Sequence, residues 1–269
     1  MPDSYAGIIL VGGESKRYGR PKALVEINGK TFLELVFDAL SELTNRIYVS
    51  YTFKTPVKAL ELTERLGGRL VEDKDLPCSG PPRGLSSILL ETESDWYWIV
   101  AVDYPFIESS ILRKLSDIAL TTKADAITPL LEKGYPAVTL GFVNKDALKA
   151  LYNSCKAKAV LTRTTDLYRG ARHSIYVGWT ILSASSKPFA NVNTADQLLN
   201  NVERELVLDL IIGNNKTYLK AINSLVNGEQ NLASVYFAQE SEEYRMLGLN
   251  LLSTHAWRDA VKLGMSRKD

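Results

Sequence analysis

One glycine-rich stretch near the N-terminus, residues 7–22, constrains this chain more than any other feature. The apolar run from Ile8 to Val11 predicts a buried strand of a parallel sheet. It leads directly into GGESKRYGRPK, whose three glycines permit backbone conformations that turn amides toward an anion. Ser15 adds a hydroxyl donor, and Arg17 and Lys22 add positive charge suited to phosphate oxygens. We therefore expect a loop that holds polyphosphate.

This stretch matches neither of the two common phosphate-binding motifs. A P-loop requires G-x-x-x-x-G-K-[ST], but here five residues separate Gly13 from Gly19, and Lys22 is followed by Ala23. The dinucleotide fingerprint G-x-G-x-x-G is also absent. The stretch resembles the signature L-x-G-G-x-S-x-R-x-G-x-x-K of nucleotidyltransferases that make nucleotide-diphospho compounds. The alternative is a glycine-rich surface turn with solvated charges.

The composition is that of an ordinary soluble protein, with 45% hydrophobic and 23% charged residues among 269. Because 32 basic residues face 31 acidic ones, the formal charge is only +1, which argues against a nucleic-acid partner. No apolar run is long enough for a membrane span and no signal-peptide pattern is present, so we expect no membrane partner and a cytoplasmic localisation. Two cysteines, Cys78 and Cys155, argue against a disulfide framework or a zinc cluster.

Helical and strand patterns alternate after Lys22. Thr31 and Glu34 fit a capping box at the start of a helix with an apolar face. Another helix is expected between Pro56 and the glycine pair at 67–68. The other predicted helices are 85–93 and 109–120, and the predicted strands are 47–51, 70–71, 97–102, 126–128 and 137–142.

This alternation predicts an α/β fold with a Rossmann-like, mostly parallel sheet and helices on both faces. Ligands of such sheets bind beyond the carboxyl ends of the strands. Predicted strands end at Val11, Val71 and Val102. The residues that follow them, including Gly12, Asp73 and Asp103, should therefore converge on one crevice.

The character of the sequence changes after the segment NVNT at 191–194. From about 195 to 262 we expect no strands but helices separated by breakers, with one apolar stripe at Leu206, Leu210 and Ile211. We therefore divide the chain into a nucleotidyltransferase domain, 1–200, and an all-α C-terminal module of four or five helices, 201–269.

Asp103 follows the most apolar predicted strand, and a carboxylate placed there must be paired or hold a cation. Beside a polyphosphate loop, that cation would be Mg²⁺, which favours one or two carboxylates together with phosphate oxygens. The alternative is an aspartate that caps the turn before Pro105. Asn191 and Asn193 could place an amide on a phosphate or on a metal-bound water, whereas Thr194 has a purely structural interpretation as a helix cap.

Asp73 precedes a second glycine-containing loop, in which Gly80 and Gly84 allow close approach of the backbone to a base. A carboxylate can accept hydrogen bonds from the two adjacent donors of guanine, and Asp75 competes for this role with Asp73. A solvated loop acid is the alternative. Cys78, in the same loop, is interpreted as an ordinary loop cysteine rather than as a thiol nucleophile.

These motifs together resemble the molybdenum cofactor guanylyltransferases, which attach GMP from GTP to the phosphate of molybdopterin. The resemblance extends over about residues 6–200 and implies the nucleotide-diphospho-sugar transferase type of fold. The matching segments are LVGGESKRYG with Lys22, EINGK at 26–30, Asp73 with GPPRG at 80–84, DYPF at 103–106, Tyr135-Pro136 and NVNT at 191–194.

The resemblance also implies roles for individual residues. Nucleotide binding is expected at Leu10, Gly12, Gly13, Ser15, Lys22, Asp73 and Gly80. Lys22, Arg17 and Asp103 are the expected catalytic residues, with Asp103 and Asn193 at the metal and Mg²⁺ as the cofactor. The chain departs from the family pattern at Val11, at Ser50 where asparagine is frequent, and at Pro82-Arg83 within the segment that reads the base.

The expected partners are GTP, molybdopterin or another phosphorylated small molecule, and a molybdoenzyme. Within the same superfamily, the chain could instead transfer CMP to molybdopterin, GMP to a cobamide precursor, or a nucleotide to a sugar phosphate. A hypothesis of another class is a nucleotide-binding regulatory or scaffold protein that acts through its helical tail. Intact Lys22 and Asp103 argue against that hypothesis.

Overall fold

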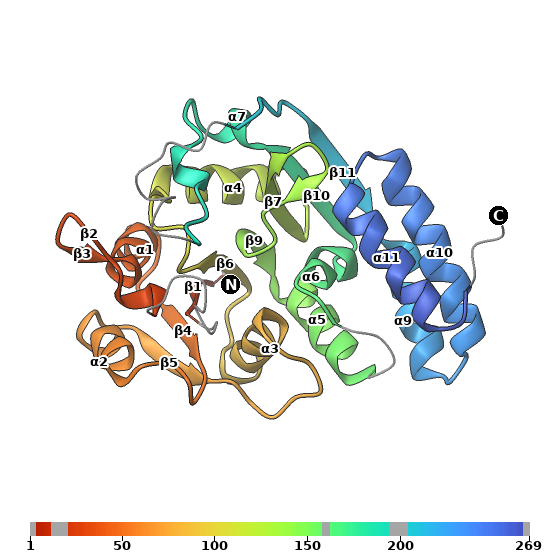
Figure 1. Ribbon diagram of the computed structural model, residues 1–269, viewed down its shortest axis with the longest axis horizontal. Helices are drawn as coiled ribbons and strands as arrows, with labels where there is room; N and C mark the ends of the chain where they lie inside the picture. The colour runs from red at the N-terminus through yellow and green to blue at the C-terminus, as the bar shows by residue number, and fades with distance from the viewer. Residues whose placement is uncertain (1–3, 12–20, 158–161, 194–203, 266–269) are drawn as a thin grey trace.

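The computed structural model describes residues 4–11, 21–157, 162–193 and 204–265, and its centre is one large mixed sheet (Figure 1). Its strand order is β11-β10-β7-β9-β6-β1-β4-β5, with β8 paired to β7. The strands are β1 (Tyr5–Leu10), β4 (Ile47–Tyr51), β5 (Arg69–Glu72), β6 (Trp96–Ala101), β7 (Ala126–Glu132), β8 (Tyr135–Pro136), β9 (Leu140–Asn144), β10 (His173–Gly178) and β11 (Leu210–Asn214). A separate small hairpin consists of β2 (Glu26–Ile27) and β3 (Lys30–Thr31).

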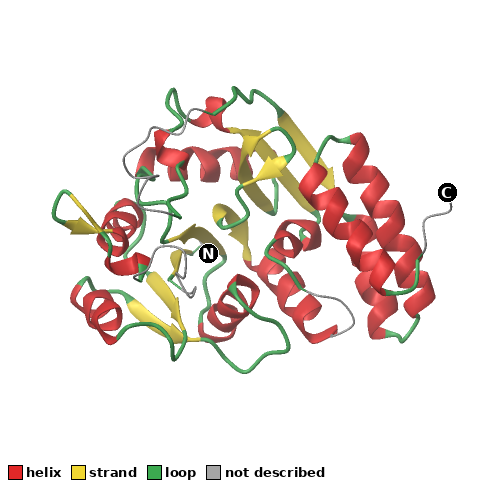
Figure 2. Cartoon of the chain, in the orientation of Figure 1, coloured by secondary structure: helices red, strands yellow, loops and turns green. Residues whose placement is uncertain are grey.

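Helices cover both faces of the sheet, as Figure 2 shows. Those of the first part of the chain are α1 (Phe32–Ser41), α2 (Val57–Arg65), α3 (Pro81–Glu91), α4 (Ser109–Thr122), α5 (Lys145–Ala157), α6 (Thr165–Gly170) and α7 (Trp179–Leu182), with 3₁₀ turns η1 (Lys22–Leu24) and η2 (Lys187–Phe189). Helix α4 contacts α1 and α7, whereas α3, α5 and α6 form a second connected group. This three-layer arrangement confirms the predicted α/β class.

Local sequence signals explain the starts of α1, α2 and α3. The Thr31 hydroxyl accepts from the Glu34 amide at 3.2 Å while the Glu34 carboxylate accepts from the Thr31 amide at 2.7 Å, which is the predicted capping box. Pro56 caps α2 as predicted. Helix α3, however, begins at Pro81 rather than at Leu85. Gly80 adopts φ +64°, which allows the chain to turn sharply into the helix, and Pro81 has the fixed φ that the first helical position favours.

The central strands β5, β4, β1 and β6 are all parallel. Leu10 at the end of β1 is paired with Ser50 on β4 and with Ala101 on β6, and Ser50 is in turn paired with Val71 on β5. The carboxyl ends of these strands therefore lie along one edge of the sheet. The segments after β1, β5 and β6 leave from that edge, as the sequence predicts.

The C-terminal region contains α9 (Lys216–Val226), α10 (Gln230–Met246) and α11 (Asn250–Lys262), so its predicted helical character is confirmed. The expectation that it contains no strand is wrong. Leu210 and Ile211 belong to β11, which pairs antiparallel with β10, and not to a helical stripe. The leucine- and isoleucine-rich run at 206–212 suits an extended chain, and β10 offers it an edge to pair with.

The buried apolar residues of the helical region belong to two clusters, one shared with the sheet domain and one mainly its own. Tyr244, Leu249 and Leu252 belong to the main core of the sheet domain. Phe237 and Tyr218 instead belong to a smaller cluster that lies mainly among α9, α10 and α11. Figure 1 shows these helices side by side next to β11 and α5. The region is therefore continuous with the core, although its larger part has a core of its own.

A buried ion network reinforces this contact. The Arg169 guanidinium on α6 is fully buried and donates to Glu240 on α10 at 2.9 and 2.7 Å. It also donates to Asp166 at 2.6 Å and to Asp259 on α11 at 2.9 Å. Arg163 reaches the other oxygen of Asp259 at 2.5 Å. Because a buried charge is costly unless it is paired, α6 depends on α10 and α11.

Candidate active site

The chain enters the candidate site at the end of β1, where Leu10 is 5% exposed. The structure describes the chain as far as Val11 and again from Pro21. The predicted phosphate-binding residues Gly12, Gly13, Ser15 and Arg17 lie outside the described residues, and their roles stay predictions. Lys22 begins the 3₁₀ turn η1, and its side chain is 16% exposed. The described part of the site therefore depends on what Lys22 contacts.

Lys22 joins two residues that are distant in the sequence. Its ammonium lies 3.3 Å from Oδ2 of Asp103 and donates to Oδ1 of Asn193 at 2.5 Å. The Asn193 amide in turn donates to Oδ1 of Asn191. A backbone hydrogen bond of 2.8 Å from the Val192 amide to the Asp103 carbonyl holds the 191–193 segment beside the end of β6. Lys22, Asp103 and Asn193 thus lie together, whereas Gly12, which is predicted to converge with Asp73 and Asp103, and Thr194 lie outside the described residues.

Burial and charge act in opposite directions on Asp103. Burial raises the pKa of its carboxyl, while the Lys22 ammonium lowers it. One carboxylate oxygen, Oδ1, is buried and accepts no hydrogen bond from the residues that the structure describes, whereas Oδ2 faces Lys22. An acceptor without a donor is costly in a protein interior, and a cation is one partner that would satisfy it.

The oxygen atoms near Asp103 suit Mg²⁺, which protein and substrate hold together, better than a metal ion that protein side chains alone would hold. Among the described residues, no group of three or more His, Cys, Asp or Glu side chains could hold a metal ion. Mg²⁺ is commonly held by one or two carboxylates together with water and substrate phosphates. Asp103 supplies such a carboxylate, and its unsatisfied Oδ1 is the atom suited to the ion. Asn193 Oδ1 is engaged by Lys22, so it is a weaker candidate ligand.

A second cluster surrounds Asp73, immediately after β5. The buried Ser50 hydroxyl donates to Oδ1 of Asp73 at 2.7 Å. Burial raises the pKa of the Asp73 carboxyl, and the Ser50 hydrogen bond and the Arg83 charge oppose that rise. A Cβ atom on Gly84 would lie 2.2 Å from Ser50 Oγ and 3.2 Å from Asp73 Oδ1. Only glycine at position 84 therefore leaves this hydrogen bond undisturbed.

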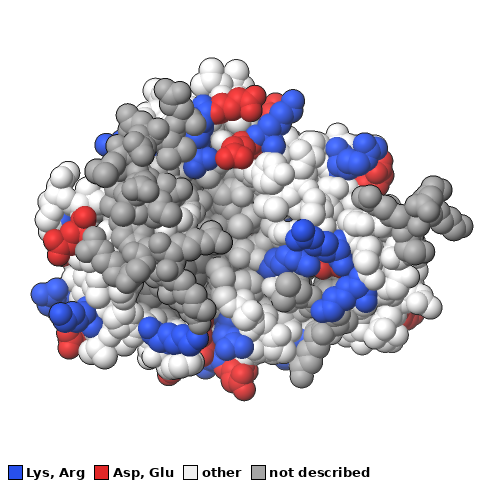
Figure 3. All heavy atoms as spheres, in the orientation of Figure 1, with Lys and Arg blue, Asp and Glu red and all other residues white. Residues whose placement is uncertain are grey.

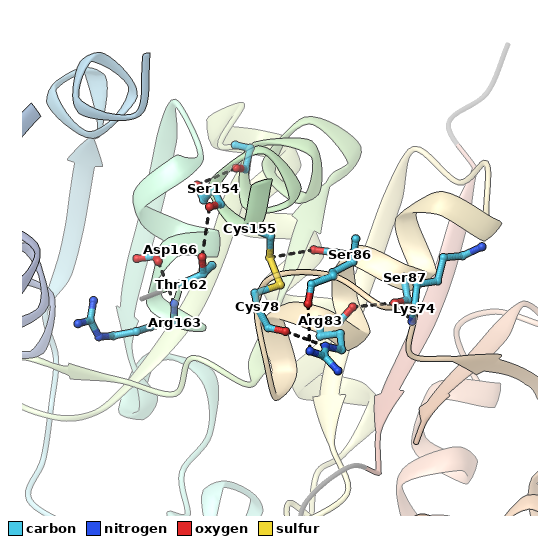
Figure 4. Close-up of a disulfide and its surroundings, with 12 residues drawn as sticks. Lys74, Cys78, Arg83, Ser86, Ser87, Ser154, Cys155, Thr162, Arg163 and Asp166 are labelled. Atoms are coloured by element: carbon cyan, nitrogen blue, oxygen red, sulfur yellow. Dashed lines mark hydrogen bonds between the residues drawn. A yellow bond between two sulfur atoms is a disulfide. The ribbon is translucent and has the colours of Figure 1, made fainter. Parts of the chain in front are cut away.

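The argument against disulfides and the interpretation of Cys78 as an ordinary loop cysteine are wrong. Cys78 and Cys155 form a disulfide across 77 residues of sequence, and no described cysteine is free. Figure 4 shows the bond linking the loop before α3 to helix α5. Helices α3 and α5 pack against each other, and this contact, which cysteine counting cannot reveal, brings the two residues together.

Sequence reasoning identified Ser50 and Arg83 only as departures from a family pattern. In the structure, Ser50 is the direct partner of Asp73, and Arg83 donates to two carbonyl groups of the neighbouring loop. Ser50 is paired in register with Val71, two residues before Asp73, so strand pairing was the missing signal. The competing candidate Asp75 is exposed, whereas Asp73 is half-buried and bonded to Ser50, which favours Asp73.

The described surface agrees with the balanced composition. On the face in Figure 3, Lys and Arg side chains form separate groups, several of them beside Asp or Glu, and not one continuous basic stripe. Within the described ranges, none of the helices has the length and apolar character needed to traverse a bilayer.

The site combines a glycine-rich segment after β1, at the parallel centre of a mixed sheet, with a Lys22–Asp103 pair beyond the end of β6, an arrangement that suits an NTP transferase of the α/β type. The chain belongs to the family described as "MobA-like NTP transferase domain", which it matches over residues 7–174. The matched range is more than half of the chain and includes Lys22, Asp103 and the Asp73 cluster, whereas Asn191 and Asn193 lie beyond it.

Curated relatives and solved structures agree with this assignment. A "probable molybdenum cofactor guanylyltransferase" from Geobacillus sp. is 28% identical over 200 residues, covering 71% of this chain and 95% of that protein. One of the same description from Bacillus cytotoxicus is 31% identical over 150 residues, covering 55% of this chain and 73% of that protein.

The same fold occurs in solved structures. Molybdopterin-guanine dinucleotide biosynthesis protein A from Archaeoglobus fulgidus superposes with a TM-score of 0.59 at 21% identity, covering 72% of this chain and 95% of that one. A 4-diphosphocytidyl-2C-methyl-D-erythritol synthase from Anaerococcus prevotii gives 0.53 at 11% identity, with 73% and 93% covered. The fold is therefore shared by enzymes that are named for different nucleotides.

Proposed function

We propose that this protein transfers GMP from GTP to the phosphate of molybdopterin and releases pyrophosphate. The observation that carries the proposal is the contact of Lys22 with both Asp103 and Asn193 at the carboxyl end of β6. The names of the curated relatives support the choice of GTP and molybdopterin as substrates.

The reaction needs little covalent chemistry from the protein. A phosphate monoester is largely dianionic at pH 7, because its second pKa is about 6, so the acceptor oxygen can attack the α-phosphorus without a protein base. As the new P–O bond forms, the bond to the β-phosphate oxygen breaks and pyrophosphate leaves. In this proposal, Lys22, Arg17 and the amides of Gly12 and Gly13 neutralise charge on these phosphates, and the position of Lys22 beside Asp103 supports its part.

Asp103 is the proposed ligand of Mg²⁺, with Asn193 beside it. When bound, the ion neutralises charge on the α-phosphate and on the departing pyrophosphate. Asp103 provides the negative charge that holds the ion, and the carboxyl must be ionised for this. Because burial raises its pKa, Lys22 also serves to keep Asp103 ionised in the absence of substrate.

Asp73 is the proposed reader of guanine. Ser50 occupies Oδ1 and thereby fixes the orientation of the carboxylate, whose other oxygen can accept from the base. Gly80, at φ +64°, turns the chain into α3, and Gly84 in the first turn of that helix lets the backbone approach this carboxylate without an intervening side chain. Leu10 is the last residue of β1, which lies in the sheet between β6, before Asp103, and β4 and β5, before Asp73.

The proposal places the protein in the cytoplasm, where GTP is made, with a molybdoenzyme as the recipient of the product. Disulfides are rare in reducing compartments, except in some heat-adapted organisms. Cys78 is 6% and Cys155 1% exposed, and such burial limits attack by a thiolate reductant. A buried disulfide is thus compatible with this location.

The decisive experiment incubates the protein with Mg²⁺, purified molybdopterin and each of GTP, CTP, UTP and ATP, followed by mass analysis of the products. We expect a guanine dinucleotide and pyrophosphate with GTP alone. A product with CTP alone would show that the protein transfers CMP and not GMP. Stabilisation by GTP with no product from molybdopterin, from a cobamide precursor or from sugar phosphates would favour a binding protein.

A further inference from the structure

The loop at residues 74–80, between Asp73 and the start of α3, is held by contacts from α3 and α5. Arg83, in the first turn of α3, folds back and donates from Nε to the Cys78 carbonyl at 2.7 Å. Its terminal nitrogen donates to the Leu76 carbonyl at 3.0 Å. A planar guanidinium can bind two such carbonyls at once, whereas a lysine ammonium has no comparable fork. Arg83 therefore fixes the shape of the loop at two points.

The disulfide provides a third, covalent point of attachment. Cys78 lies in the loop and Cys155 lies on α5, and their Cα atoms are 5.2 Å apart. The hydroxyl of Ser86, on the buried face of α3, lies 3.6 Å from the Cys155 sulfur. The loop is thus linked through the disulfide to the helix layer that covers the sheet, as Figure 4 shows.

The start of the loop is also attached to α3. The Lys74 amide donates to the Ser87 hydroxyl at 2.8 Å, and that hydroxyl donates to the Arg83 carbonyl at 2.9 Å. Asp73 immediately precedes Lys74, and Gly80 ends the loop. A change in the path of the loop would therefore shift the positions of Asp73 at one end and Gly80 at the other.

We propose that Arg83 and the Cys78–Cys155 disulfide are positioning elements for base recognition, which fix the 74–80 loop so that Asp73 discriminates between nucleobases. This inference rests on the proposed function, in which Asp73 reads guanine. Neither element touches the phosphates, so their loss changes nucleobase selectivity and KM for the nucleotide much more than kcat.

The test of the disulfide begins with its chemistry. A dithiol such as dithiothreitol supplies two electrons and two protons, becomes a cyclic disulfide, and leaves Cys78 and Cys155 as thiols. Intact mass should therefore increase by two hydrogen masses on reduction under denaturing conditions, with no free thiol beforehand. Purified protein that contains two free thiols overturns this part of the proposal.

Three variants then test whether the disulfide affects nucleobase selectivity: Cys78→Ser, Cys155→Ser and the double variant. Each breaks the same bond, so all three should lower the ratio of kcat/KM for GTP over ITP, which lacks the exocyclic amine, by about three- to tenfold. The double variant should be no worse than either single one. Cys155 lies on α5, outside the proposed nucleotide site, so an effect of Cys155→Ser on selectivity must pass through the disulfide.

Hydrogen–deuterium exchange gives a readout that does not depend on activity. Peptides that cover 74–80 should take up more deuterium in the variants and in reduced wild type, and reoxidation of the wild type should restore protection. If the variants melt earlier but keep wild-type selectivity and wild-type exchange in this loop, the disulfide is only a structural crosslink and the proposal is overturned.

Arg83 is tested by Arg83→Lys and Arg83→Gln, with the exposed Arg113→Gln on α4 as the matched control. Both Arg83 variants should raise KM for GTP by about three- to tenfold with kcat within about twofold, and Arg113→Gln should match wild type. Wild-type protein that forms no GMP product contradicts the proposed function itself. GMP transfer with unchanged GTP-over-ITP selectivity in every variant contradicts only this inference.

Discussion

The Lys22 ammonium lies 3.3 Å from Oδ2 of Asp103 and 2.5 Å from Oδ1 of Asn193, so one cation connects chain segments that are 81 and 171 residues away. Lys22 begins the turn η1, and Asp103 follows the end of β6, where the sequence pattern predicts it. Lys22, the last residue of the glycine-rich stretch, thus links that stretch to the ends of two distant segments.

Lys22→Ala removes this cation and is expected to slow transfer by roughly 100-fold and to raise KM for GTP, because charge on the phosphates is no longer neutralised in the ground or transition state. Steady-state kinetics with GTP and molybdopterin give both parameters. Lys30→Ala is the control, since Lys30 pairs with Asp38 on the exposed surface. Unchanged kcat and KM in Lys22→Ala would show that this lysine serves only as a partner of Asp103.

Asp103→Ala is expected to lower transfer by roughly 1,000-fold while the fold is retained, because the variant lacks the proposed metal ligand but keeps the backbone hydrogen bond with Val192. Turnover is measured across a magnesium titration, and circular dichroism checks the fold. Near-normal turnover at limiting magnesium would identify Asp103 as a structural residue. Asp103→Asn should behave similarly, since it keeps the shape and removes the charge.

Gly84→Ala is expected to destabilise the protein by about 1–3 kcal/mol and to weaken GTP binding, because the new Cβ would lie 2.2 Å from Ser50 Oγ. Denaturant unfolding and GTP titration measure the two effects. The Ser50→Ala, Gly84→Ala double variant makes room for the methyl group. It should recover stability without recovering selectivity for guanine, since Asp73 still lacks its hydroxyl donor. Recovery of both would show that the Ser50 hydrogen bond is not needed.

The buried network around Arg169 predicts a pH dependence of stability. Burial raises the pKa of Glu240 to about 7 and the pKa of Asp166 to about 6. The folded state therefore holds protons that the unfolded state releases above about pH 4.5. Between roughly pH 5 and 7.5, these carboxyls therefore cost stability as the pH rises. His255 acts in the opposite direction, because burial lowers its pKa to about 4.

A comparison with Glu240→Gln isolates the contribution of this carboxyl. Relative to wild type, the variant should gain free energy of unfolding as the pH rises from 5 to 8, on the order of 2 kcal/mol, because glutamine never ionises. Glu64→Gln on the exposed face of α2 should show no such trend. If Glu240→Gln instead loses stability with rising pH, attraction by Arg169 outweighs the cost of burial.

Truncation after Asn200 should lower the melting temperature by about 10 °C or more, because Arg169 loses Glu240 and Asp259 and β10 loses its neighbour β11. The remaining folded fraction should still transfer GMP, since every nucleotide and metal candidate precedes residue 194. Rates are compared below both melting points. A truncated protein that is folded and binds GTP, yet forms no product, would place part of the acceptor site in the helical region.

The central half of the sheet could be predicted because each of its elements carries its own local signal. The capping box at Thr31, the Pro56 helix start and the apolar runs of β1, β4 and β6 all act over a few residues. The positions of Asp73 and Asp103 then followed from the general rule about strand ends. These parts of the fold need no knowledge of distant contacts.

The remaining features depend on partners far away in the sequence. β11 is a strand because β10 offers an open edge, and Leu210 carries no local sign of that edge. Cys78 and Cys155 meet only because α3 packs on α5, and Ser50 reaches Asp73 only through the register of β4 with β5. Such contacts are properties of tertiary structure, so periodicity and spacing could not reveal them.

The Arg169 network has a consequence for synthesis of the chain on the ribosome. Arg169 is made 71 residues before Glu240 and 90 residues before Asp259. Until those carboxylates leave the ribosome, Asp166 is the only acid of the network available to it, and burial of the guanidinium is unfavourable. The β10 side of the sheet should therefore complete its folding only after translation ends, whereas β1, β4, β5 and β6 can assemble while the chain is still growing.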